Sequence, residues 1–246
     1  MKESIVLVYG DSMCLPSIAD HVAVSDAYPE LLAEYQASRG LRTRVYSRAE
    51  GGRTIKDHWT RYDDDRRYFS AGPDDLLIIH AGMVDCAPRP LPLRWRRRLE
   101  RQPGFIRAPI VSFIKNNRPF LLKRGFVFYK IDPTVFKQRI EEWLDHATKL
   151  YAHIAVVPIP PIGQAAEDIS PGWRKNIILY NRIMADAVAR HPRGVYFVPL
   201  HDVLSQSEEK FNDCISPLDG YHLLKKGHQL ICDLIIGFLE ADARAK

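Results

Sequence analysis

The chain has 246 residues, of which 46% are hydrophobic and 26% are charged, with a formal net charge of +5. These are ordinary values for a globular protein, and they are far from those of the disordered and membrane classes. No apolar run approaches the roughly 20 residues that span a bilayer, so no membrane span is expected. An α/β fold of this length can form one unit around a large core, and we expect a single domain over residues 1–246.

The N-terminal residues lead directly into the apolar run Ile5 to Tyr9, which is too short for a secretory signal and is expected to be the first strand. The four cysteines show neither CxxC spacing nor a Cys/His ligand pattern; they are Cys14, Cys86, Cys214 and Cys232. This pattern predicts neither disulfides nor a zinc site, and it favours a reducing, cytoplasmic location. We expect no metal and no cofactor.

Strands are predicted where short runs of Val, Ile, Leu and Tyr end at Gly or Pro. They lie at Ile5 to Tyr9, Arg42 to Tyr46, Leu76 to His80, Ile154 to Ile159 and Val195 to Val198. Nearly continuous hydrophobic runs are typical of parallel strands covered on both faces.

Segments with helical periodicity lie between these strands. Asp132-Pro133 supplies an N-cap and a first helical position, and Ser170-Pro171 opens a second helix in the same way. The last helix is expected to carry apolar residues at Leu224, Ile231, Ile235 and Phe238. Alternating strands and helices predict a three-layer α/β/α sandwich, flavodoxin-like, with a five-stranded, mostly parallel sheet.

The alternation fails over residues 86–132, where proline, arginine and aromatic residues mix without a sustained period. We expect an insertion at about 86–132 that forms a lid or a substrate wall over the carboxyl edge of the sheet. Its arginine cluster runs from Arg94 to Arg101. Nucleic acid, an acidic lipid surface and an anionic substrate are possible partners, but a solvated helical face paired with acids such as Glu100 is the commoner explanation. Without a recognised binding module, nucleic-acid binding is not expected.

The chemistry is carried by motifs at the two ends of the chain. Gly10-Asp11-Ser12 follows the first strand, and Asp219-Gly220-Tyr221-His222 precedes the last helix. A serine, a histidine and a carboxylate are the nucleophile, base and orienting acid that acyl chemistry requires. Because ligands of open α/β sheets bind at the carboxyl ends of the strands, we expect the two motifs to meet at one rim.

Each motif taken alone also has a purely structural, non-catalytic explanation. Gly-Asp-Ser is a common turn sequence, and Asp219 is also a plausible N-cap of the last helix. Histidines and cysteines outside the motifs are expected to pack or lie on the surface rather than react; they are His80, His228, Cys14 and Cys86.

With a glycine block at Gly51-Gly52 and a further block at Gly82 to Asp85, four short motifs occur in an order that resembles the SGNH or GDSL hydrolases. The resemblance implies an esterase or acyltransferase of the serine type, without a cofactor. It implies Ser12 as nucleophile, His222 as general base and Asp219 as the carboxylate that orients it. The N–H groups of Ser12 and Gly52 would stabilise the oxyanion, with the Val84 backbone as a further candidate.

The third block departs from the family, which has asparagine where this chain has Val84. An asparagine side chain donates to the oxyanion, and losing such a donor costs on the order of 10²- to 10³-fold in turnover. Arg89 is a candidate substitute, because a guanidinium can stabilise an oxyanion or hold an anionic substrate. Asp11 and Asp85 are further candidates for contact with substrate.

The prediction is therefore a serine hydrolase that acts on a small-molecule O-acyl ester. One alternative is an acyltransferase that moves the acyl group to a sugar or a small-metabolite acceptor, because the acyl-enzyme is common to both reactions. The other is a non-catalytic binding protein on the same scaffold, which the valine at position 84 motivates.

Overall fold

The computed structural model describes residues 3–68, 72 and 74–245. Its five strands form one sheet in the order β2-β1-β3-β4-β5, and every neighbouring pair is parallel. The strands are β1 (Glu3–Gly10), β2 (Arg42–Ser47), β3 (Leu76–His80), β4 (His153–Val156) and β5 (Val195–Phe197). This all-parallel sheet confirms the predicted fold class.

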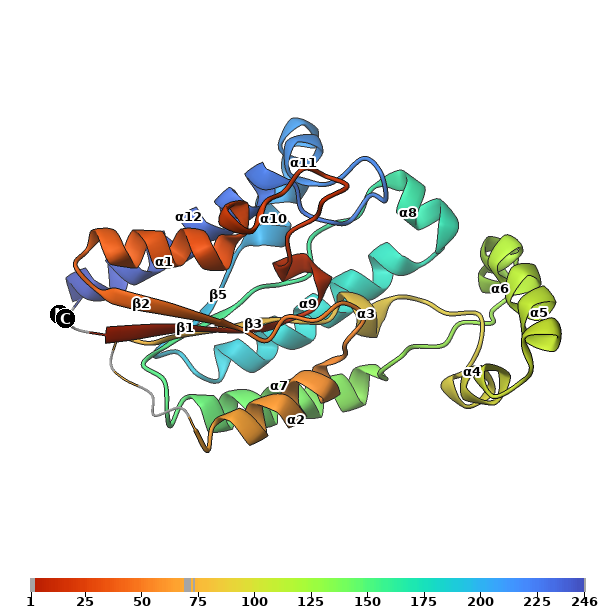
Figure 1. The fold of residues 1–246 in the computed structure, drawn as a ribbon, viewed down its shortest axis with the longest axis horizontal. Helices are drawn as coiled ribbons and strands as arrows, with labels where there is room; N and C mark the ends of the chain where they lie inside the picture. The colour runs from red at the N-terminus through yellow and green to blue at the C-terminus, as the bar shows by residue number, and fades with distance from the viewer. Residues whose placement is uncertain (1–2, 69–71, 73, 246) are drawn as a thin grey trace.

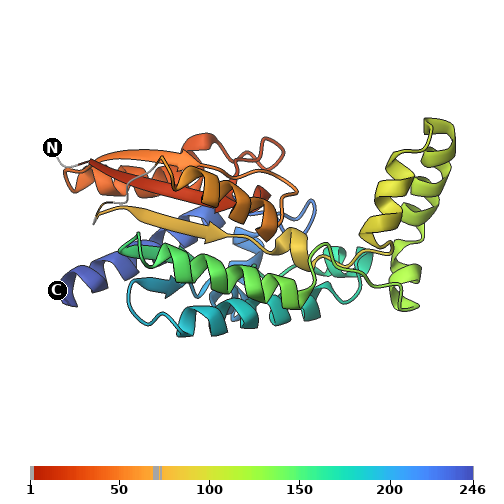
Figure 2. The same cartoon turned by 90° about the horizontal axis from the view of Figure 1, so that it is seen from below.

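Two layers of helices cover the sheet (Figures 1 and 2). One layer contains α1 (Tyr28–Ser38) and α12 (Lys225–Ala245), with α10 (Leu200–Ser205) and α11 (Glu208–Cys214) beside α12. The other contains α2 (Ile55–Asp65), α7 (Pro133–Ala147) and α9 (Trp173–Ala189). None of the described helices is long and apolar enough to cross a membrane.

The core fills both faces of the sheet, and its largest aromatic side chains lie between β1 and the second helical layer. The Tyr9 and Trp143 rings meet edge to face with centroids 5.6 Å apart, and Tyr62 lies 5.7 Å from Tyr9. The Tyr9 hydroxyl donates to Asp65 at 2.9 Å, and Arg48 holds the same carboxylate through two hydrogen bonds of 2.9 Å. These aromatic contacts and the satisfied polar atoms fix β1 against α2 and α7.

Several predicted boundaries are wrong, and two of them have a clear physical cause. β4 ends at Val156, three residues before the predicted Ile159, because Pro158 has no N–H to donate to the neighbouring strand. The helix predicted to open at Ser170-Pro171 begins instead at Trp173. Gly172 precedes it with φ +88°, a left-handed conformation that glycine adopts without strain. By contrast, the Asp132 carboxylate caps α7 as predicted, accepting from the Thr134 N–H at 2.9 Å.

Residues 86–132 contain three helices where the sequence showed no period: α4 (Leu93–Glu100), α5 (Gly104–Asn116) and α6 (Arg118–Lys123). We call residues 93–123 the helical arm. The arm projects beyond the carboxyl ends of the strands, at the end of the molecule opposite the two termini (Figures 1 and 2). At the base of the arm the outgoing and returning segments pair as an antiparallel β-bridge, in which Arg89 and Phe128 exchange two backbone hydrogen bonds of 2.9 Å. α6 also contacts α8 (Gln164–Ile169).

Candidate active site

Ser12 follows β1 directly and begins the short 3-10 helix η1 (Ser12–Cys14). The turn into it needs glycine at position 10, because a Cβ there would lie 2.2 Å from Cys14 Sγ and 2.7 Å from the His80 carbonyl oxygen. The Asp11 carboxylate accepts from the Met13 N–H at 3.0 Å and caps η1. This tight turn presents Ser12 at the carboxyl end of the sheet.

The Asp219–His222 loop lies just before α12 and reaches the same place. The Asp219 carboxylate accepts hydrogen bonds of 3.0 Å from the N–H groups of Tyr221 and His222, and it also binds His222 Nδ1. Ser216 N–H donates to the His222 carbonyl at 2.8 Å and fixes the backbone beside the ring. Asp219 is therefore not the N-cap of α12, which begins at Lys225.

The two loops join through one hydrogen bond, because His222 Nε2 lies 2.9 Å from Ser12 Oγ. Ser12, His222 and Asp219 thus form a continuous chain of hydrogen bonds between residues 210 positions apart. With Nδ1 donating to the carboxylate, Nε2 of a neutral imidazole accepts the serine proton. The arrangement is that of a nucleophile, a base and an orienting acid.

The charges around His222 oppose the effect of its burial. Burial lowers the pKa of His222, but the hydrogen bond and charge of Asp219, with a further contribution from Asp11, outweigh it and leave the pKa raised. Burial raises the pKa of Asp219, but the bonds from His222 and Tyr221 outweigh it and leave the pKa lowered. The carboxylate therefore stays ionised and stabilises an imidazolium.

A cavity of about 450 Å³ opens at this chain of hydrogen bonds. The serine loop contributes Ser12, and the histidine loop contributes Asp219 and Tyr221. Its other walls come from the second and third motif blocks, from the base of the arm and from α9, including Gly52, Val84, Arg89, Arg118 and Trp173. The cavity therefore brings residues from six separate parts of the chain together.

Gly52 and Val84 lie in the cavity wall as the sequence predicted. Gly52 has φ +78° in a turn that the Arg53 N–H closes onto the Glu50 carbonyl at 3.4 Å. Its carbonyl accepts a hydrogen bond from the Lys130 ammonium, and its N–H has no hydrogen-bond partner among the residues the structure describes. Val84 belongs to the one-turn helix α3 (Met83–Cys86) and presents an apolar side chain.

Asp11 and Asp85 lie behind the cavity rather than in its wall, with exposed fractions of 1% and 0%. Asp85 accepts from the Ile55 N–H at 3.1 Å, so it ties α3 to the start of α2 and thereby holds the second and third blocks together. Burial raises the pKa of Asp11 to about 6 and that of Asp85 to about 8. Their placement gives both carboxyl groups a positioning role.

The histidines and cysteines outside the motifs are packed, as predicted. Cys14 and His80 both contact the Tyr28 hydroxyl, and His228 accepts from the Tyr28 N–H at 3.4 Å. Cys86 accepts from the Trp173 indole at 3.3 Å. Burial raises the pKa of both thiols, so neither is a nucleophile near neutral pH. In the described part of the chain, no group of three or more His, Cys, Asp or Glu side chains is placed to hold a metal ion.

Arg118 and Trp173 are among the cavity residues that the sequence did not single out as site residues. Trp173 follows the glycine that displaces the start of α9, and Arg118 begins α6 in a segment without a periodic pattern. Only the three-dimensional path of the arm brings Arg118 to the wall of the cavity that also contains Ser12.

A sequence model of the GDSL-like lipase/acylhydrolase family matches residues 8–230. The chain belongs to this family. The match spans all four blocks and confirms the resemblance inferred from them. No curated protein sequence matches the chain.

Solved structures of GDSL-type and related hydrolases share the fold at low sequence identity. A lipase/acylhydrolase from Enterococcus faecalis is 15% identical with a TM-score of 0.63, and the alignment covers 98% of this chain and 97% of that one. Axe2, an acetylxylan esterase from Geobacillus stearothermophilus, is 15% identical with a TM-score of 0.59 over 95% and 92% of the two chains. A carbohydrate acetylesterase family member from Sinorhizobium meliloti is 15% identical with a TM-score of 0.56, and the alignment covers 98% of each chain.

Proposed function

We propose that this member of the GDSL family is a serine esterase that cleaves O-acyl esters through an acyl-enzyme on Ser12. The observation that carries the proposal is the hydrogen-bond chain from Ser12 through His222 to Asp219 at the wall of a cavity of about 450 Å³. Family membership and esterase neighbours support it.

In the first half of the reaction, Ser12 Oγ attacks the acyl carbonyl while His222 Nε2 takes the hydroxyl proton. Asp219 holds the ring so that Nε2 faces the serine, and its charge stabilises the imidazolium. His222 then returns the proton to the leaving alcohol, which departs and leaves the acyl group on Ser12. In the second half, His222 deprotonates a water molecule that attacks the acyl-enzyme, and Ser12 is regenerated with release of the acid.

The proposed oxyanion donors are the N–H groups of Ser12 and Gly52. The Gly52 N–H is free to donate, and the Lys130 bond to the carbonyl of the same residue fixes the loop. The Val84 backbone remains a third candidate, whereas its side chain has no hydrogen to give. The residues around 86–132 form the wall that selects the substrate.

Hydrolysis of p-nitrophenyl esters of increasing acyl length tests the proposal. The wild type is expected to release p-nitrophenol, and Ser12→Ala and His222→Ala are expected to lose about 10⁴-fold or more in kcat. Ser112→Ala on the exposed face of α5 is the matched control and should match the wild type. Equal turnover by wild type and Ser12→Ala would contradict the proposal. Adding glucose or glycerol as an acceptor distinguishes hydrolysis from acyl transfer by the product formed.

A further inference from the structure

Two arginines from the base of the helical arm reach the cavity that holds Ser12. Arg89 lies before α4 and Arg118 begins α6, and both also line a second cavity of about 380 Å³ on the arm. The two guanidinium groups therefore stand between the serine cavity and the arm cavity.

Neither guanidinium forms a direct ion pair with a carboxylate of the described residues, although the charge of Asp85 acts on Arg89 at longer range. Among the residues that the structure describes, no acidic side chain forms an ion pair with either arginine, and the Nε atoms of both are buried without a hydrogen-bond partner. One Nη group of Arg118 donates a hydrogen bond of 2.9 Å to the Pro88 carbonyl. Burial lowers the pKa of both arginines, and the charges of Arg96 and Arg118 add to the effect on Arg89. Partly buried cations that lie close enough for one to lower the pKa of the other are stabilised by an anion placed between them.

The arm cavity contains further positively charged side chains beyond Arg89 and Arg118. Its wall carries three further cations and one carboxylate, that of Glu100, which already pairs with Arg96 at 2.9 Å. The three cations are Arg96, Arg107 and Lys115. Apolar side chains fill the rest of the wall, namely Pro90, Leu91, Leu99, Val111 and Ile114. The cavity thus suits a ligand with several negative charges beside an apolar or uncharged part.

We propose that the physiological substrate is an acyl ester that carries a phosphate or diphosphate group, which Arg89 and Arg118 hold. The inference rests on the proposed esterase function, and it adds the substrate class. With the ester at Ser12, the phosphate lies at the boundary between the two cavities, and any part of the substrate beyond it enters the arm cavity.

The donor geometry favours a phosphate over a carboxylate. A guanidinium presents a planar fork of N–H donors that binds phosphate oxygens in pairs, and two forks offer more donors than one carboxylate can accept. A single carboxylate would also leave most of the positive charge around the two cavities uncompensated. A phosphate dianion or a diphosphate matches both the donors and the charge.

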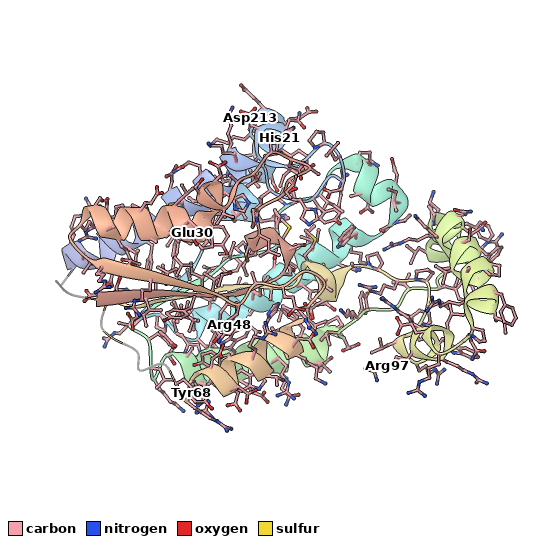
Figure 3. All side chains as sticks on the ribbon, viewed as in Figure 1. His21, Glu30, Arg48, Tyr68, Arg97 and Asp213 are labelled. Atoms are coloured by element: carbon pink, nitrogen blue, oxygen red, sulfur yellow. The ribbon has the colours of Figure 1, made fainter. Side chains whose placement is uncertain are left out.

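Binding of inorganic diphosphate to Ser12→Ala tests the clamp without any turnover. Isothermal titration calorimetry should show binding that weakens about 10- to 100-fold in Arg89→Gln and in Arg118→Gln, the range expected when one hydrogen bond to a charged group is lost. Arg89→Lys and Arg118→Lys keep the charge and should lose less. Arg97→Gln is the matched control, because Arg97 is exposed on α4 (Figure 3) and lines neither of the two cavities. Equal diphosphate affinity in the control and in both clamp variants would overturn the proposal.

Turnover of matched acetate esters tests the same clamp in the active wild type. O-acetyl glycerol 3-phosphate should have a kcat/KM about 10- to 100-fold above that of O-acetyl glycerol and O-acetyl glycerate, with the preference lost in Arg118→Gln. Comparing kcat/KM for oleoyl glycerol 3-phosphate and oleoyl glycerol shows whether the phosphate belongs to a lipid substrate or to a soluble one. A preference for neutral or carboxylate esters would overturn the proposal while leaving the esterase intact. Diphosphate binding without hydrolysis of any ester would instead contradict the esterase and leave the clamp standing.

Discussion

The body of the protein and its helical arm bury their side chains to very different degrees. Trp143, Tyr9 and Tyr62 in the body are fully buried, whereas no side chain of α4 or α5 is buried. Phe105 and Phe113 of the arm are 80% and 61% exposed. The difference fits the proposed division of roles, in which a rigid sheet edge holds the catalytic residues and a segment that contributes little to the core forms the wall around them.

The largest expected effect concerns the orienting carboxylate in the body. Asp219→Asn should lower kcat by about 10⁴-fold, because an amide neither fixes the Nδ1–H tautomer of His222 nor stabilises its cation. Asp213→Asn is the matched control, since this exposed carboxylate of α11 pairs with Lys226 on the surface and does not line the cavity (Figure 3). Steady-state kinetics on p-nitrophenyl acetate measure both. A loss of less than tenfold in Asp219→Asn would show that Asp219 does not orient the base.

The second prediction compares stability directly between body and arm. Trp143→Ala should lower the free energy of unfolding by about 3–5 kcal/mol, because it leaves a cavity under β1. Phe113→Ala on the arm should change it by no more than about 0.5 kcal/mol. Urea unfolding followed by circular dichroism measures both variants. A large loss in Phe113→Ala would mean that the arm packs against something in solution.

A third, smaller effect is expected at the incomplete third block. Val84→Asn should raise kcat for a p-nitrophenyl ester by about tenfold at most, because the new amide can reach the oxyanion but is not preorganised there. Val84→Ala is the control, because it changes the volume of the side chain without adding an amide donor. An unchanged kcat in Val84→Asn would indicate that another group already occupies the position of the third donor.

The smallest expected effect is a displacement of the pH profile. Because the pKa of His222 is raised above its usual value of 6.5, kcat/KM should rise with pH through a pKa above 6.5 as the base loses its proton. The negative charge of Asp11 helps to raise the pKa of His222. Asp11→Asn should therefore move the midpoint of the kcat/KM profile to lower pH. The pH dependence of kcat/KM measures the midpoint, and a move to higher pH would contradict the electrostatic account.

The sheet and the proposed catalytic residues were predictable because their signals are local. Buried parallel strands are short, continuous apolar runs, and Ser12, Asp219 and His222 lie in loops whose place in the fold follows from the strand order. The arm was not predictable as helix. α5 contains Pro109 and buries no face, so no apolar stripe with a helical period marks it. The position of Arg118 in the wall of the cavity that holds Ser12 depends on the whole path of the arm, which no local pattern encodes.

Reaction with a fluorophosphonate probe tests the proposed role of Ser12 most directly. Peptide mass spectrometry of the labelled wild type should find the probe on Ser12, with labelling lost in Ser12→Ala and strongly slowed in His222→Ala. The exposed Ser112 should stay unmodified in the same sample. A folded wild type that takes up no probe, or takes it up equally in Ser12→Ala, would contradict the assignment of Ser12 as the nucleophile.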